Sequence, residues 1–568
     1  MNVIDWLVLG ITLLSVVVYG LYKSRGTKNI DGFLLADKQL PWYHVGLSVM
    51  ATQASAITFL SAPGQAYSDG LRFVQFYFGL PLAMVVLCIT FIPIFHRLKV
   101  YTAYEFLEKR FDIKTRTLTA FLFLIQRGVS TGITIYAPSI VLSSILNLDI
   151  SYTTIFIGSV VILYTVYGGT KAVSYTQMLQ MGIIFAGLFF AAYMVVHLLP
   201  ENVGFMDALH IAGKMDKLNA IDTTFDLNNK YNVWSGIIGG FFLQLSYFGT
   251  DQSQVGRYLT GKSITQSRLG LIMNGLVKIP MQFFILLIGT LVFTFYQFHQ
   301  PPVFFNQVEV SRIEKSINKA EYNKLEADYK VAHAEKLQHV NKLVDAIHQD
   351  NEQIVDAAGV ELQAAEKKVK NIRKSAINLI KKSDQVADTN DTNYVFLNFV
   401  TNYLPTGLVG LLIAIIFLAS MGSTASGLNS LASTTVVDVY KRLINKEGSD
   451  SKYLSASRWA TIGWGVFCVI VALYASKLGN LIEAVNILGS LFYGTILGVF
   501  VVAFYLKKVE GTAVFYAALL AEACIVVAWL TDLTAFLWLN VIGCVLVMLF
   551  SLVFQRLLRK PIEGITIN

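Results

Sequence analysis

Long apolar segments recur along nearly the whole chain, and they constrain the fold more than any other feature. A helix needs about 20 apolar residues to cross the core of a bilayer, and about thirteen segments meet this criterion. Of the 568 residues, 54% are hydrophobic and only 14% are charged. We therefore expect an all-α polytopic membrane protein. Its spans are predicted near 3–22, 44–66, 72–97, 116–146, 150–167, 172–199, 233–256, 268–298, 405–440, 455–476, 480–505, 511–531 and 534–556.

Basic residues gather in alternate connections between these segments, for example at 97–116 and 441–452. Lys and Arg accumulate in cytoplasmic loops, so the N-terminus is predicted outside and the C-terminus inside. Residues 1–22 carry Asp5 and Trp6 where a signal peptide has basic residues, which favours a retained first helix. The formal charge of +8 is spread over the loops, and this distribution argues against nucleic-acid binding.

One long polar segment, 301–392, interrupts the apolar pattern and divides the chain into a first membrane part, 1–300, the insertion, and a second membrane part, 393–568. Over 355–379 its apolar residues alternate three and four apart, as in a coiled coil. We expect a hairpin of two antiparallel helices that turns near 349–351 and stands about 50 Å out from the external side of the membrane. Two interpretations stay open: a solvated spacer, and a docking arm for a partner protein or a second protomer.

Hydroxyl and glycine residues are concentrated in the stretch ASMGSTASGLNS, which directly follows a strongly apolar run. In a helix, Ser420, Ser423 and Thr424 share one face. Their oxygens suit a hard cation such as sodium, which needs several oxygen ligands at once. The alternative is that small residues allow close helix packing while the hydroxyls bond to carbonyls of their own helix.

A second segment, 47–71, is also small, polar and interrupted by Pro and Gly, which is typical of a broken transporter helix. Unwinding there would free the carbonyls of Ala51 and Ala54. Six other spans separate this segment from the one at 405–440. That separation fits corresponding helices of two five-helix inverted repeats.

The chain resembles the sodium/solute symporter family, which has the LeuT-type inverted-repeat architecture. The resemblance rests on the motifs ATQASAITFLSAPGQAY, HRLKVYTAYEFLEKRF, TGITIYAPSIVL, YTVYGGTKAV, GTDQSQVGRYL and ASMGSTASGLNSLASTTVVDVYKR. Their wording is closest to the iodide, monocarboxylate and multivitamin branch.

The resemblance implies a sodium site in the two polar segments. It is formed by the backbone of Ala51, Ala54 and Ser420 and by the hydroxyls of Ser423 and Thr424. Two departures concern a second sodium site: Gln177 replaces an aspartate found in most relatives, and Gly427 replaces a hydroxyl found in some. Without that carboxylate, a second ion would lack a neutralising charge. We therefore predict one sodium ion per transport cycle.

Comparison with the sugar transporters of this family implies the substrate-binding positions Gln53, Thr58, Tyr77, Asp251, Lys278 and Asn486. Thr58 and Tyr77 depart from the sugar pattern. Because an unpaired charge inside the membrane is costly, Asp251 and Lys278 are expected to pair with each other or with the substrate. Arg127 has two interpretations, as the counter-ion of a substrate carboxylate or as a side chain that reaches to the cytoplasmic surface, and we favour the second.

These features predict a sodium-coupled symporter that imports a small organic solute by alternating access. The solute would be a monocarboxylate, a sugar acid, a sugar or a polyol, and sodium would be the coupling ion. No P-loop, zinc-ligand or nucleophile-elbow spacing indicates an enzyme. Two alternatives are a transporter-like membrane sensor and a proton-coupled carrier, which would want a carboxylate at the ion site. The resemblance and the insertion point to a bacterial inner membrane.

Overall fold

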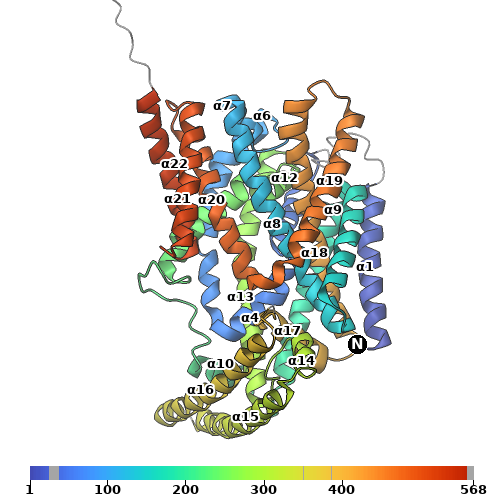
Figure 1. Cartoon of the computed structure of the whole chain (residues 1–568), viewed down its shortest axis with the longest axis vertical. Coiled ribbons are helices and arrows are strands. Elements are labelled where there is room, and N and C mark those ends of the chain that lie inside the picture. Colours follow the sequence, from blue (N-terminus) through green and yellow to red (C-terminus); the bar gives the residue numbers. More distant parts are fainter. Residues whose placement is uncertain (25–37, 350, 386, 559–568) are drawn as a thin grey trace, which may run out of the picture.

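A bundle of long helices makes up most of the molecule, and two further helices lie across one end of it (Figure 1). The computed structural model describes residues 1–24, 38–349, 351–385 and 387–558. Among these residues the regular elements are helices, apart from one isolated β-bridge. The predicted all-α class is therefore confirmed. We call the end with the two crossing helices the hairpin face, and the other end the opposite face.

The elements follow the three predicted parts of the chain. The first part contains α1 (Val3–Ser24), α3 (Trp42–Gln53), α4 (Ala56–Asp69), η2 (Gly70–Tyr77), α5 (Leu80–Val86), η3 (Leu87–Phe91), α6 (Ile92–Leu98), α7 (Glu105–Arg110), α8 (Ile113–Leu146), α9 (Ile150–His197), α10 (Phe205–Lys214), η4 (Ser235–Gly239), α11 (Gly240–Thr250), α12 (Gln252–Tyr258) and α13 (Ile264–Phe298). The insertion contains α14 (Gln307–Ile313), α15 (Lys319–His348) and α16 (Glu352–Ser383). The last part contains α17 (Thr392–Tyr403), α18 (Leu408–Thr434), η5 (Thr435–Ile444), α19 (Asp450–Leu473), η6 (Ala475–Leu478), α20 (Leu481–Tyr505), α21 (Gly511–Leu530) and α22 (Phe536–Leu558).

Membrane-spanning length is common among these elements. Within the described residues, ten helical stretches are long and apolar enough to cross a membrane. Other spans are assembled from shorter helices, so the predicted number of thirteen stays a prediction.

The predicted break in the second span lies between α3 and α4, at Ala54 and Ser55. In a continuous helix the N–H groups of Ser55 and Thr58 would bond to the carbonyls of Ala51 and Ala54. They donate instead to the carbonyls of Gln53, at 3.0 Å, and of Ser55, at 2.9 Å. The break therefore frees the two carbonyls of Ala51 and Ala54 from helical hydrogen bonds.

The helix α9 contains two spans joined by a sharp reversal. The hydroxyls of Tyr164 and Thr176 lie 2.9 Å apart, although twelve residues separate them in the sequence. A straight helix would hold positions so far apart at a distance of about 18 Å. The chain must therefore turn back between them, at the predicted boundary between the spans 150–167 and 172–199.

The hairpin of α15 and α16 lies against the bundle along its length (Figure 1). Near its tip, Lys214 of α10 donates to Asp356 at 2.5 Å. Midway along α15, the buried His333 places Nε2 3.2 Å from the carbonyl oxygen of Tyr296 in α13. The prediction that the hairpin stands about 50 Å out from the membrane is therefore wrong.

The apolar seam of the hairpin explains why it packs down. Val340 and Leu343 of α15 and Leu362 of α16 are fully buried and belong to the same apolar cluster as the bundle core. The helices end and begin where the sequence predicted, with α15 ending at His348 and α16 beginning at Glu352. Periodicity correctly predicted the hairpin but could not show that its seam also contacts the bundle.

Candidate functional site

A cavity lies inside the bundle, beside the break between α3 and α4. Three of the predicted substrate residues, Gln53, Tyr77 and Asn486, line it, together with Arg127 and Ser423. The predicted residues Thr58, Asp251 and Lys278 are buried outside its lining. Lining residues that the sequence analysis did not single out include Ser130, Thr131, Thr134, Gln244, Tyr247 and Tyr493.

The missed polar residues of α8 carry a recognisable signal. Arg127, Ser130, Thr131 and Thr134 follow one another at spacings of three, four and seven residues from the arginine. Residues at these spacings share one face of a helix. A search for polar faces within apolar spans could therefore have identified this wall of the cavity.

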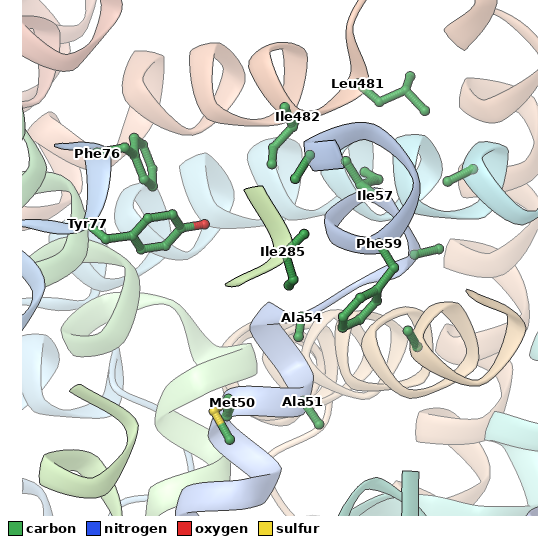
Figure 2. Packing of buried hydrophobic residues seen from close by; sticks show 14 of the residues in the cluster. Met50, Ala51, Ala54, Ile57, Phe59, Phe76, Tyr77, Ile285, Leu481 and Ile482 are labelled. Carbon is green, nitrogen blue, oxygen red and sulfur yellow. The ribbon is translucent and has the colours of Figure 1, made fainter. Parts of the chain in front are cut away.

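Apolar side chains form another part of the wall (Figure 2). Ile57 of α4 and Ile482 of α20 lie near each other, and Phe76 and Tyr77 of η2 approach from the side. Tyr77 points its hydroxyl toward the broken helix. The cavity thus combines an apolar wall with a few polar groups, as small-molecule sites do.

Arg127, Asp251 and Tyr493 form a buried cluster at the floor of the cavity. Arg127 makes an ion pair with Asp251 and donates from Nη2 to the Tyr493 hydroxyl at 3.0 Å. The Tyr493 hydroxyl donates to Asp251 Oδ2 at 2.8 Å. The favoured interpretation that Arg127 reaches to the membrane surface is therefore wrong, because a buried carboxylate holds its guanidinium inside the bundle.

Lys278 does not pair with Asp251, which corrects the second expectation about buried charges. Its ammonium group is fully buried, has no hydrogen-bond partner, and lies 5.8 Å from the centroid of the Tyr77 ring. The reason is local: α11 ends at Thr250, and Asp251 then caps α12 by accepting from Ser253 N at 2.8 Å. This turn directs the carboxylate toward α8 and α20 rather than toward α13.

The predicted sodium residues come from two elements that meet at the break. Thr52 Oγ1 at the end of α3 lies 3.1 Å from Ser426 Oγ of α18, one turn from Ser423. Ser423 Oγ donates to the carbonyls of Ala419, at 2.8 Å, and Ser420, at 3.2 Å.

Thr424 differs from the other hydroxyl residues of α18. Its Oγ1 is buried without a hydrogen-bond partner. Leaving such a group unpaired is costly. An unpaired hydroxyl on α18 and two freed carbonyls on α3 form a donor set that fits a sodium ion.

Gln177 of α9 joins the same two elements. Its Oε1 accepts from Ser48 Oγ at 2.6 Å. Its Nε2 donates to Thr52 Oγ1, Gly422 O and Ser426 Oγ at 3.1, 3.1 and 3.0 Å. A neutral amide therefore occupies the space between oxygens that could otherwise face a cation.

Packing accounts for the second departure from the relatives, at Gly427. A Cβ atom at this position would collide with the side chain of Thr131, which belongs to the cavity wall of α8. The helices α8 and α18 thus approach closely where some relatives carry a hydroxyl.

Broken helices that meet at a polar cavity within a membrane bundle define a secondary transporter. The model of the "Sodium:solute symporter family" matches residues 33–313 and 375–521, and the chain belongs to this family. The unmatched stretch between these ranges contains most of the hairpin.

Curated relatives share the family but only moderate identity. The sodium-coupled monocarboxylate transporter 1 of Xenopus laevis is 26% identical over 87% of this chain and 67% of its own length. The sodium/sialic acid symporter of Aliivibrio fischeri is 23% identical over 97% of this chain and 92% of its own length. Among solved structures, a Na+-coupled sialic acid symporter in a substrate-bound, outward-open state matches with a TM-score of 0.75 and 21% identity, covering 98% of both chains. This match shows a shared fold.

Proposed function

We propose that the chain is a sodium-coupled symporter that imports a small solute bearing a carboxylate group. The observation that carries this proposal is Arg127, which lines the cavity and keeps a buried Nε without a hydrogen-bond partner. A guanidinium binds a carboxylate through two parallel hydrogen bonds. Relatives named for a monocarboxylate and for sialic acid support a solute of this class.

Sodium couples to the solute through the broken helix. The proposed ligands are the carbonyls of Ala51, Ala54 and Ser420 and the hydroxyls of Ser423 and Thr424. Ser423 also lines the cavity, so the ion and the solute share one wall. A sodium ion that holds α3 against α18 completes this wall, and each ligand then raises the affinity for the other.

The proposed stoichiometry is one sodium ion per solute. The Nε2 of Gln177 donates to three oxygens of α3 and α18 and thereby takes the place of a second cation. A monocarboxylate carried with one sodium ion moves no net charge. The sodium concentration gradient alone would then drive accumulation.

The hairpin face is proposed to be external, with the N-terminus outside, the C-terminus inside and the protein in a bacterial inner membrane. This follows the distribution of basic loops. The hairpin is proposed to act within the protomer rather than to dock a partner, because its apolar seam is buried. Its large exposed apolar residues are scattered along the described part of α15, α16 and their approach, at Ile317, Val331, Ile354 and Val360.

Uptake into proteoliposomes tests this function. The purified protein is expected to accumulate lactate or N-acetylneuraminate, but not glucose, when a sodium gradient replaces a potassium gradient. Ser423→Ala with Thr424→Ala should abolish the sodium dependence. The matched control Ser430→Ala, which removes only a 2.7 Å bond to the carbonyl of Gly427, should retain it. Accumulation of glucose in preference to both acids would contradict the proposal.

A further inference from the structure

The ion pair of Arg127 and Asp251 joins separate elements of the bundle. Arg127 lies midway along α8, whereas Asp251 is the residue at which α11 stops and α12 begins. Tyr493 of α20 bonds to both partners. The cluster therefore fastens the start of α12 to two long helices at the floor of the cavity.

The cluster lies on the side of the cavity that is away from the hairpin. Just beyond α12, Gly261 forms the isolated bridge with Leu40, ahead of α3. Tyr104, which precedes α7, donates to the carbonyl of Thr250 at 2.8 Å. The helices α7 and α12 lie toward the end of the molecule opposite the hairpin (Figure 1). A solute that leaves the cavity toward this opposite face must pass the cluster.

The two charges differ in how completely they are satisfied. Asp251 is saturated: Oδ1 accepts from Ser253 N and Oγ, at 2.8 and 2.6 Å, and Oδ2 accepts from Arg127 and Tyr493. Arg127 is not, because its buried Nε has no partner while its guanidinium borders the cavity and the Tyr247 ring. A carboxylate in the cavity can therefore reach the unpaired edge of Arg127.

Separating a buried ion pair without a replacement leaves uncompensated charge, which is strongly unfavourable. Asp251 can leave Arg127 only when another anion neutralises the guanidinium. A carboxylate in the cavity supplies this anion, whereas a neutral solute does not. Asp251 thus competes with the solute for one cation.

We propose that the Arg127–Asp251 pair is a latch that the carboxylate of the transported solute releases. The solute carboxylate takes over Arg127, Asp251 separates from it, and α12 becomes free to move and open the cavity toward the opposite face. Asp251 is therefore a positioning residue that makes movement of α12 depend on an anionic solute. This inference rests on the proposed function, since it requires a carboxylate in the cavity.

Hydrogen exchange of the full-length protein in nanodiscs tests the latch. In sodium without solute, the amides of α12 in the wild type should exchange slowly, and lactate or N-acetylneuraminate should accelerate their exchange about tenfold. Asp251→Asn should show the fast exchange without any solute, because Asn keeps an oxygen for Ser253 but carries no charge for Arg127. Tyr493→Phe removes one hydrogen bond and keeps the ion pair, so its exchange should stay within about threefold of the wild type.

Binding supplies a second measurement. With its competitor removed, Arg127 in Asp251→Asn should bind the probe carboxylate about tenfold more tightly than in the wild type, as measured by calorimetry. If this variant does not fold, Arg127→Gln with Asp251→Asn leaves no buried charge. The double variant should show fast exchange of α12 and no response to the probe.

The outcomes separate this inference from the proposed function. Slow exchange of α12 in both Asp251→Asn and the double variant would overturn the latch even if the wild type takes up a carboxylate. A probe that binds the wild type without accelerating the exchange of α12 would overturn release by solute. A wild type that takes up neither acid defeats the proposed function, whereas the comparison without solute still decides whether the ion pair restrains α12.

Discussion

Two buried ion pairs of this protein place the same contact in different mechanical settings. In the hairpin, Lys336 of α15 lies 3.2 Å from Glu366 of α16, with side-chain exposures of 3% and 11%. In the bundle, the side chains of Arg127 and Asp251 are 11% and 0% exposed. Burial is therefore similar, and the difference lies in which elements each pair joins.

The hairpin pair joins two helices that pack on each other along their length, so it moves with them as one unit. Burial raises the pKa of Glu366, but the charges of Lys336 and Lys370 outweigh this effect and the net shift is downward. The bundle pair instead joins α8 to a short helix that begins at a break. The comparison teaches that an ion pair within a rigid unit stabilises it, whereas one between separable elements can control their movement.

The largest effect is expected from removing Arg127. Arg127→Gln leaves Asp251 buried and unpaired, which should lower the free energy of unfolding by about 3–5 kcal/mol and abolish carboxylate uptake. Adding Asp251→Asn should restore most of the stability, because no buried charge then remains, but not the uptake. Thermal unfolding and proteoliposome uptake measure the two effects. Sodium-driven uptake by the double variant would show that Arg127 does not bind the solute.

Breaking the hairpin pair should affect stability alone. Lys336→Met leaves Glu366 unpaired and should destabilise the hairpin by about 3 kcal/mol, visible as faster hydrogen exchange in α15 and α16. Lys336→Met with Glu366→Leu should be close to neutral, and it should transport as the wild type does. Loss of uptake in this matched double variant would mean that the hairpin pair also controls movement, and the contrast between the pairs would fail.

A smaller change should convert the neutral contact at Gln177 into a charged one. Gln177→Asp replaces the donating amide with a carboxylate that faces Gly422 O and Ser426 Oγ, which together favour a cation. The Hill coefficient for sodium activation of uptake should rise from about 1 toward 2. Gln177→Asn, which keeps an amide, is the control. An unchanged coefficient for the aspartate variant would show that the missing carboxylate does not set the stoichiometry.

Local signals made much of the fold predictable from the sequence. Hydropathy predicted the all-α membrane class, Pro and Gly within 47–71 predicted the broken helix, and apolar periodicity predicted the hairpin turn. The pairing of Asp251 was not predictable in this way. Its partner depends on the direction in which the break between α11 and α12 turns the carboxylate, and Arg127 lies 124 residues earlier in the sequence. The packing of the hairpin on the bundle likewise depends on a surface formed only after folding.

The smallest expected effect concerns Asp388, a carboxyl group in the connection from the hairpin to α17. Burial raises its pKa to about 7; the N–H of Asn390 opposes this shift, and Glu309 and Asp391 add to it. Because the pKa is higher in the folded state, the stabilisation is complete below the unfolded value near 3.9 and is lost as the pH rises through about 7. The melting temperature should therefore fall by about 2 °C at most between pH 5.5 and 8.0, and Asp388→Asn should remove this part of the slope. Equal slopes for the wild type and the variant would show that the connection does not sense pH, and that charges at the hairpin act only through pairs such as Lys336 and Glu366.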